Sequence, residues 1–290
     1  PWDSDYIIPR NGFILRDASE QTMRITMDVS LDPTLGCGQA HRWVRTADGW
    51  QGVIGREVVT LVQTEDGFDC SGSSDRRRIA DYFRADDDLA AMVAEVSSRD
   101  PRLACLAAAC PGLRLLRQDR WECLATYVLA TNANVKRIAA MVEAVCERFG
   151  DDLGGRRSFP EPGRILDGCD ELGLCRLGYR EGRLLKLAEK VECGEVDLER
   201  IAGEDRVGCV EALMEIEGVG PKVADCVALF AFDHLDAFPV DVRIAKVMES
   251  MYGVSGSYRK VSEYGRETFG RYAGYAQELL YHCGRSVTCP

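Results

Sequence analysis

The stretch that decides the fold is EGVGPKVADC, residues 217–226. Pro221 leads into apolar text that predicts a helix, and a proline suits the first helical turn because its missing N–H has no partner there. Gly218 and Gly220 allow backbone conformations that are closed to other residues. The preceding text, VGCVEALMEI, also has a helical pattern, so the sequence predicts a helix–hairpin–helix over residues 207–232.

The turn between these two helices has a chemistry of its own. Backbone N–H groups of a Gly-x-Gly turn can bind a DNA phosphate without reading the base sequence. Gly218, Val219 and Gly220 are therefore candidate phosphate-binding residues. A plain helical hairpin with a glycine cap is the structural alternative, and the turn alone does not decide between the two.

Lys222 is the second residue of the expected helix, where the helix dipole disfavours a cation. Only six of the 36 basic residues are lysines, so the chain usually supplies positive charge as arginine, and a lysine at this unfavourable place needs an explanation. Asp241 follows Pro-Val and precedes another expected helix. It can cap that helix, a contribution of about 1 kcal/mol, while its second oxygen faces a cleft near Lys222.

Toward the N-terminus the pattern changes from helices to strands. HRWVRT, WQGVIG, EVVTLVQT and FDCSG are short segments rich in Val, Thr and Trp, and turn signals separate them. The sequence therefore predicts the α+β class: an N-terminal antiparallel β-sheet domain with flanking helices over 1–113, then an all-helical domain over 114–290. The helical domain contains the hairpin and a Pro-Val-Asp loop at 239–241. TNAN, before an expected helix, is a cap signal.

Composition fits an ordinary soluble protein, with 46% hydrophobic and 29% charged residues. No apolar run approaches the roughly 18 residues of a membrane span, and the first residues lack a signal-peptide pattern. We expect an intracellular protein of the cytoplasm or nucleoid, or of the nucleus in a eukaryote, without membrane association. The net charge of −11 argues against far-field attraction to nucleic acid, but a local basic strip or backbone amides can still bind phosphate.

The thirteen cysteines are scattered through mostly apolar text. In a chain without an export signal, reduced and buried thiols are expected. The sequence has no C-x-x-C pair, and Cys283 and Cys289 form a lone pair near its end. An iron–sulfur cluster takes four cysteines, which must lie close together, and this pair supplies two, so no cluster is expected. Other metal sites are only weakly indicated.

Several motifs together resemble one family. The Gly-Val-Gly-x-Lys hairpin followed by Pro-Val-Asp resembles the helix–hairpin–helix–Gly/Pro–Asp DNA glycosylases, and more narrowly the 8-oxoguanine DNA glycosylases with an N-terminal sheet domain. The resemblance covers nearly the whole chain in the family's order. Its further motifs are GQAHRW (38–43), QDRWECLATYVLATNANVKRI (118–138), LGYR (177–180) and FGRYAGYAQELLY (269–281).

The resemblance implies a bifunctional DNA glycosylase and apurinic/apyrimidinic lyase of base excision repair, which turns a damaged nucleotide out of the duplex. Lys222 would attack C1′, release 8-oxoguanine and form a Schiff base. Proton loss at C2′ would then cut the strand by β-elimination. Asp241 would stabilise the cationic sugar. The chemistry requires no cofactor, and a structural cation at the hairpin stays an open alternative.

The resemblance also assigns binding residues position by position. The Gly38 carbonyl would accept the N7–H that 8-oxoguanine has and guanine lacks, and Gln277 would read the Watson–Crick edge. The base-recognition set is Gly38, Cys226, Pro239, Gln277 and Tyr281, with tyrosine where the family usually has phenylalanine. The residues expected to fill the vacated space and contact the orphaned cytosine are Asn132, Arg137, Tyr179 and Arg180. Arg243 stands where the family often has histidine, and it would bind a phosphate.

The expected partner is double-stranded DNA containing 8-oxoguanine opposite cytosine, bound by a monomer. One alternative is a related glycosylase for another damaged base, against which Gly38, Cys226 and Gln277 speak. The other is a DNA-binding module without chemistry, against which the coexistence of Lys222 and Asp241 speaks.

Overall fold

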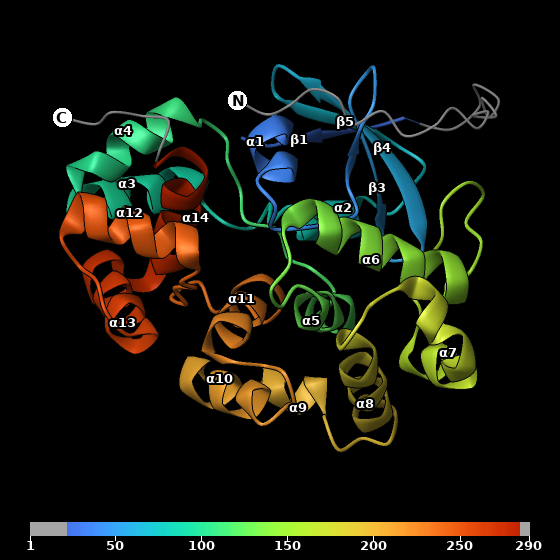
Figure 1. The fold of residues 1–290 in the computed structure, drawn as a ribbon. Helices are drawn as coiled ribbons and strands as arrows, with labels where there is room; N and C mark the ends of the chain where they lie inside the picture. Colours follow the sequence, from blue (N-terminus) through green and yellow to red (C-terminus); the bar gives the residue numbers. More distant parts are fainter. Residues whose placement is uncertain (1–21, 285–290) are drawn as a thin grey trace.

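The computed structural model describes residues 22–284, and it has a sheet at the N-terminal end and helices over the rest (Figure 1). The strands are antiparallel in the order β1-β5-β4-β3-β2. Their bounds are β1 (Met23–Thr26), β2 (Val44–Arg45), β3 (Trp50–Ile54), β4 (Glu57–Thr64) and β5 (Gly67–Ser71). The predicted α+β class, with an antiparallel sheet preceding the helices, is confirmed.

The turn signals in the sequence set the sheet register. Strands β3 and β4 pair up to Ile54 opposite Glu57, and β4 and β5 pair up to Thr64 opposite Gly67. Gly67 has a φ of +148° and a Cβ there would lie 2.0 Å from a backbone oxygen of Ile25, so only glycine fits beside β1. Only two residues of the predicted first strand, HRWVRT, form a strand, β2. Strand β1 was not predicted, because turn signals do not flank MRIT.

The helices begin and end largely where the apolar pattern predicts. Asn134 caps α6 by accepting a hydrogen bond of 2.9 Å from the backbone N–H of Arg137, as the TNAN signal indicates. The bounds in chain order are α1 (Leu31–Gly36), α2 (Arg76–Tyr82), α3 (Leu89–Arg99), α4 (Pro101–Ala109), α5 (Arg120–Leu129), α6 (Val135–Phe149), α7 (Pro162–Asp167), η1 (Cys169–Cys175), α8 (Arg180–Glu192), α9 (Leu198–Ala202), α10 (Arg206–Met214), α11 (Pro221–Ala231), α12 (Val242–Tyr252), α13 (Tyr258–Phe269), η2 (Gly270–Tyr272) and α14 (Ala273–Cys283).

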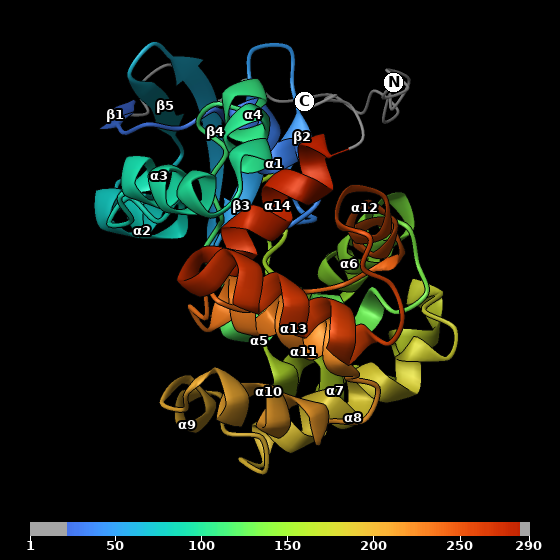
Figure 2. The same cartoon turned by 90° about the vertical axis from the view of Figure 1, so that its left-hand side faces the viewer.

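Buried apolar side chains form two clusters. The smaller cluster joins the sheet to α1 and α2 and contains Leu61, Phe68 and Phe83. The larger cluster fills the helical part and includes side chains of α3 and α4. Although α3 and α4 precede residue 113, they pack against α14, as Figure 2 shows. The last helix of the described chain therefore lies on helices from the first 110 residues.

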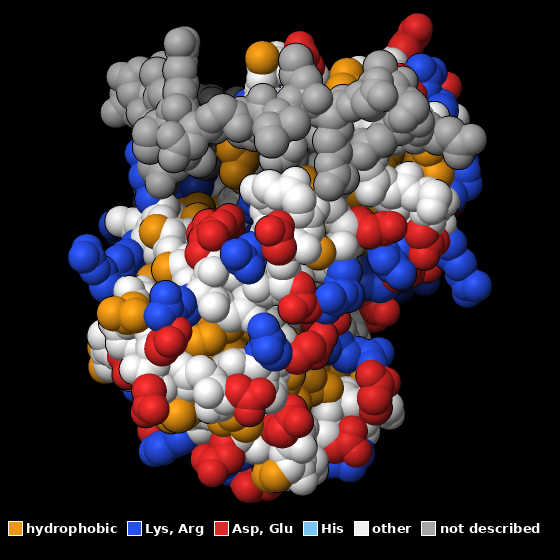
Figure 3. Space-filling view, turned by 90° about the vertical axis from the view of Figure 1, so that its right-hand side faces the viewer, with side chains coloured by type: hydrophobic (Ala, Val, Ile, Leu, Met, Phe, Trp, Pro, Cys, Tyr) orange, Lys and Arg blue, Asp and Glu red, His pale blue; other side chains and the backbone are white. Residues whose placement is uncertain are grey.

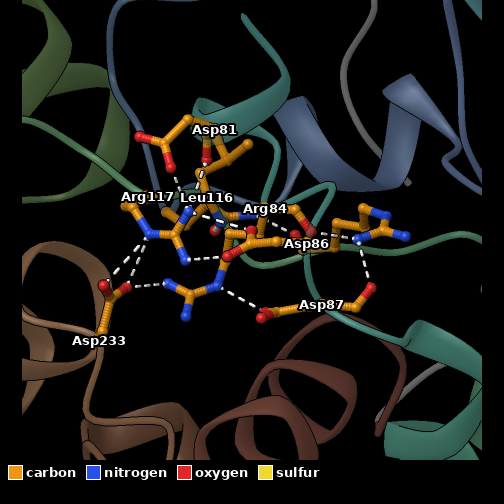
Figure 4. A network of polar contacts seen from close by, with 9 residues as sticks. Asp81, Arg84, Asp86, Asp87, Leu116, Arg117 and Asp233 are labelled. Atoms are coloured by element: carbon orange, nitrogen blue, oxygen red, sulfur yellow. Dashed lines mark hydrogen bonds and ion pairs between the residues drawn. The ribbon is translucent and has the colours of Figure 1, made fainter. Parts of the chain in front are cut away.

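A network of arginines and aspartates connects the part of the chain that contains the sheet with the helical part (Figure 4). The side chain of Arg84 is 3% exposed, and it donates to Asp87 at 2.7 Å and to Asp233 at 2.6 Å. Arg117 also donates to Asp233, at 2.9 Å, and pairs with two further carboxylates, Asp81 and Asp86. Asp233 follows α11, whereas both arginines belong to the N-terminal half of the chain. The network therefore fixes α11 relative to the part of the chain that contains the sheet.

The expectation of reduced thiols is wrong for Cys110 and Cys283, which form a disulfide across a sequence separation of 173 residues. Most other described cysteines are buried, although Cys169 and Cys193 are exposed. The sequence offered only Cys289 as a neighbour of Cys283, and Cys289 lies outside the described residues. A pairing over this distance arises from the packing of α14 on α4, which local sequence does not reveal.

Among residues 22–284 no helix is long and apolar enough to cross a bilayer. Acidic and basic side chains are interspersed on the face shown in Figure 3, which is the right-hand side of Figure 1. Neighbouring charges of opposite sign weaken each other's field. The net charge of −11 is therefore not concentrated on this face.

Candidate active site

Lys222 is the second residue of α11, as predicted, and Pro221 is the first. Its Nζ lies 5.1 Å from the centroid of the Tyr127 ring on α5, a cation–π distance. One turn further along α11, the Cys226 thiol is a hydrogen-bonding neighbour of the lysine. Burial raises the pKa of Cys226 to about 11, and the nearby lysine opposes the rise. The neighbours of the Lys222 amine thus include the aromatic ring of Tyr127 and the neutral thiol of Cys226.

His41 is a further neighbour of Lys222. Burial, reinforced by the charge of Lys222, lowers the pKa of His41 to about 4, so its imidazole is neutral at pH 7. Its Nδ1 is buried without a hydrogen-bond partner among the described residues, and its ring centre is 6.3 Å from that of Tyr127. No role was predicted for His41, because GQAHRW does not show that its histidine lies beside a lysine far along the chain.

Asp241 begins α12 and caps it as predicted. Its Oδ1 accepts a hydrogen bond of 2.7 Å from the backbone N–H of Ile244. The carboxylate acts on the thiol of Cys226 and on the phenol of Tyr281 through its charge. The structure therefore brings Asp241 to the same site as the residues of α11 and α14. Pro239, two residues earlier, is buried.

Helix α14 supplies two of the five predicted recognition residues, Gln277 and Tyr281. Gln277 is 6% exposed, and its Oε1 is buried without a donor in the described chain. Tyr281 follows one turn later, and the guanidinium carbon of Arg243 lies 4.6 Å from the centre of its ring. Arg243 also donates to the backbone carbonyl of His282 at 3.4 Å. The side chain of Arg243 thus lies against α14.

Glu278, beside Gln277, is a buried carboxyl that the sequence reasoning missed. It is 3% exposed and its Oε1 has no partner among the described residues. Burial raises its pKa to about 7, against the opposing effects of the Cys37 thiol and of Arg243. An acidic residue inside the apolar helix text AGYAQELLYHC was a signal that could have found it.

Gly38 has a φ of +95°, a conformation that favours glycine, and a Cβ there would lie 3.5 Å from Val135. The next residue, Gln39, is buried and holds the loop in place. Its Nε2 donates to the carbonyls of Thr34 and Arg114 at 2.9 Å, and its Oε1 accepts from Leu116 N–H at 2.8 Å. These bonds fix the peptide that follows Gly38.

The neighbours of Gly38 also connect it to the lysine site. The Gln39 carbonyl accepts a hydrogen bond of 3.4 Å from the Tyr127 hydroxyl, and the Cys37 thiol is a neighbour of Glu278. The loop at Gly38 therefore lies between the ring beside Lys222 and the helix that carries Gln277. The predicted base-recognition residues from both ends of the chain meet here.

The residues predicted to face the orphaned base form a second group. Asn132, with a φ of +52°, donates from its amide to the Tyr179 hydroxyl at 3.3 Å. Arg180 is 8% exposed and donates to the backbone carbonyls of Thr131 and Asn132. Arg137 is exposed and donates to the carbonyl of Arg176. In this structure both arginines bind backbone carbonyls, and Arg180 holds the turn at Asn132.

The hairpin turn takes the predicted glycine conformation at Gly218, which has a φ of +89°. The prediction is wrong for Gly220, the N-cap of α11, whose φ of −95° is open to any residue. The Val219 N–H donates to the Ile216 carbonyl at 3.0 Å, so this amide is used within the turn. Phosphate binding by these residues stays a prediction.

Comparison with known proteins identifies the family. A family model described as the N-terminal domain of 8-oxoguanine DNA glycosylase matches residues 23–124. The N-glycosylase/DNA lyase OGG1 of Arabidopsis thaliana is 32% identical over 280 residues, covering 88% of this chain and 77% of that protein. An N-glycosylase/DNA lyase of Saccharomyces cerevisiae is 27% identical, covering 88% and 83%.

The solved structures agree. The Clostridium acetobutylicum 8-oxoguanine glycosylase/lyase, in complex with double-stranded DNA containing cytosine opposite 8-oxoguanine, superposes with a TM-score of 0.85 at 28% identity. The match covers 91% of this chain and 94% of that chain. A relative above 30% identity and a shared fold along nearly the whole length leave one conclusion: the chain belongs to the 8-oxoguanine DNA glycosylase family.

Proposed function

We propose that the protein is a bifunctional glycosylase and lyase that removes 8-oxoguanine from DNA. The observation that carries this proposal is the position of Lys222 at the start of α11, among Tyr127, Cys226 and the neutral imidazole of His41. The relatives named N-glycosylase/DNA lyase support both activities. A DNA-binding module would have no need of an amine in such surroundings.

In the proposed reaction the neutral amine of Lys222 forms a bond to C1′ as the bond from C1′ to N9 of the base breaks. The base leaves with the electron pair and takes up a proton. The amine loses its proton as the sugar ring opens to a Schiff base. Loss of a proton from C2′ then expels the 3′ phosphate oxygen and cuts the strand. Asp241 stabilises the positive charge that develops on the sugar.

Recognition is proposed to divide between two groups. Gly38, Cys226, Pro239, Gln277 and Tyr281 surround the extruded base, and the buried Gln277 Oε1 without a donor supports a role in reading it. The group Asn132, Arg137, Tyr179 and Arg180 contacts the cytosine left behind. The exposure of Arg137 and of Tyr179, which is 52% exposed, supports contact with DNA.

The remaining parts of the proposal concern the protein's setting. It acts as a monomer on double-stranded DNA inside the cell. Gly218, Gly220 and Arg243 contact phosphates, and the lysine chemistry requires no cofactor, because the protein itself supplies the nucleophile.

Borohydride trapping tests the proposal directly. A duplex with one 8-oxoguanine opposite cytosine, beside an undamaged duplex, is treated with wild type and with Lys222→Gln. We expect a covalent adduct only with the lesion and only in wild type. Lys222→Gln should still bind the lesion duplex, because the amide is similar in size to the amine-bearing chain, while cleavage falls at least about 10³-fold.

The matched control is Lys246→Gln, the same change at an exposed lysine of α12. It should trap as well as wild type. Cleavage by Lys222→Gln at the wild-type rate would reject Lys222 as the nucleophile. Binding without an adduct in wild type would indicate another damaged base as the substrate, or a module without chemistry.

A further inference from the structure

Three side chains of types that can bind a metal meet at the end of α14, two of them joined as a disulfide. Cys110 is the C-cap of α4, Cys283 is the last residue of α14, and His282 precedes it. One ligand atom from each lies within 4.8 Å of the other two. Helices α4 and α14 pack against each other (Figure 2). Two sulfurs and one imidazole nitrogen are a donor set typical of zinc sites.

The backbone spacing suits a bridging ion. The Cα atoms of Cys110 and Cys283 are 7.2 Å apart, beyond the roughly 4.4–6.8 Å usual for a disulfide. A zinc ion between two thiolates inserts two bonds of about 2.3 Å and sets the sulfurs farther apart than a direct bond does. The distance between the two helix ends is thus one that two thiolates with an ion between them can span.

Two contacts of Arg243 hold the end of α14 in place. Its guanidinium carbon lies 4.6 Å from the centre of the Tyr281 ring. Arg243 also donates to the carbonyl of His282 and so holds the end of α14. Cys283 is 3% exposed, which protects a metal–sulfur bond from solvent.

We propose that the reduced protein binds a zinc ion through Cys110, His282 and Cys283, with water as the fourth ligand. Binding releases the two thiol protons and leaves a thiolate pair that neutralises the charge of the ion. The disulfide form must first gain two electrons and two protons from a reductant, such as a phosphine in vitro, before it binds metal. The ion fastens the end of α14, two residues after Tyr281, to α4.

Cobalt(II) is the probe, because it reports tetrahedral sulfur ligation by colour. Protein reduced with a phosphine is freed of the reductant and titrated with Co²⁺ under argon. We expect thiolate-to-cobalt charge-transfer absorption and tetrahedral ligand-field bands that saturate at about one ion per chain and vanish when Zn²⁺ is added. Zn²⁺ should also raise the Tm of the reduced protein.

The variants assign the ligands. Cys110→Ser and Cys283→Ser should lose the charge-transfer band, and His282→Gln should bind at least about tenfold more weakly. Cys169→Ser, at an exposed cysteine, is the matched control and should titrate like wild type. Because His282→Gln leaves both sulfurs in place, it keeps the test valid if a cysteine variant does not fold. Wild type without the band, or Cys110→Ser with it, overturns the proposal.

Discussion

At the scale of the residue, the candidate site contains two kinds of side chain: some are positioned by their own helix, and others acquire their properties from burial and from distant neighbours. Pro221, Lys222 and Asp241 take the positions in the first turns of α11 and α12 that the text predicts. His41 and Glu278 could not be found in this way, because burial and distant neighbours give them their properties. Residues whose chemistry arises from tertiary packing are the ones that sequence reasoning misses.

Gln277→Ala tests the recognition role of α14. We expect excision of 8-oxoguanine to slow by about 10–100-fold, since the variant loses hydrogen bonds to the base edge. Single-turnover kinetics measure the effect, and circular dichroism checks that the fold is intact. Unchanged excision kinetics would remove Gln277 from the recognition set.

Glu278→Gln tests the buried carboxyl. A pKa raised from 4.5 to about 7 corresponds, at 1.36 kcal/mol per unit, to at most about 3 kcal/mol. The wild type has its full stability below about pH 4.5 and loses it as the pH rises to about 7, because the folded state resists ionisation of Glu278. The variant should therefore gain stability over wild type progressively through this range and keep the gain above it.

Urea unfolding at several pH values measures that difference. Glu249→Gln, at an exposed glutamate of α12, is the control and should show no such trend. A gap between Glu278→Gln and wild type that stays constant from pH 4.5 to pH 8 would contradict the raised pKa.

At the scale of the element, periodicity and turn residues predicted most helices and the hairpin strands of the sheet. The strand β1 was missed because MRIT has only four residues and turn signals do not flank it. The hairpin between α10 and α11 was predicted well because glycine and proline have strong local preferences. Gly218, for example, has a φ of +89°, which glycine adopts readily.

Gly218→Ala should destabilise the protein by about 1–2 kcal/mol, because a Cβ is disfavoured at a positive φ. The new methyl would also lie 2.7 Å from the side chain of Arg183. Gly182→Ala is the control: that glycine lies inside α8 with open space around its Cβ position, and alanine should stabilise the helix by about 0.5–1 kcal/mol. Thermal or urea unfolding distinguishes the two signs.

At the scale of the whole molecule, the sequence predicted the order of sheet and helices but not their packing. The pairing of α4 with α14, and the network around Asp233, join residues more than a hundred positions apart. Such contacts follow from the final arrangement of all the helices. Local patterns do not contain them.

Asp233→Ala tests the network that connects the two parts. Burial pushes the pKa of Asp233 upward, but Arg84 and Arg117 outweigh it and hold the pKa below its ordinary value. Its loss leaves the buried Arg84 with a single carboxylate, so we expect a cost of about 1–3 kcal/mol. Glu199→Ala, which removes an 85% exposed partner of Arg120, should change stability by less than about 1 kcal/mol. Equal effects would contradict the role of the network.

The meeting of Gly38 with α14 has a consequence for protein synthesis. A ribosome that has completed α13 has already made Lys222, Asp241 and the hairpin, but not Gln277 or Tyr281. Under the proposed mechanism, such a nascent chain holds the reactive amine and Gly38 but lacks the two recognition residues of α14. The base pocket is therefore completed only with the last helix, and an mRNA truncated before α14 would encode the amine with an incomplete lesion filter.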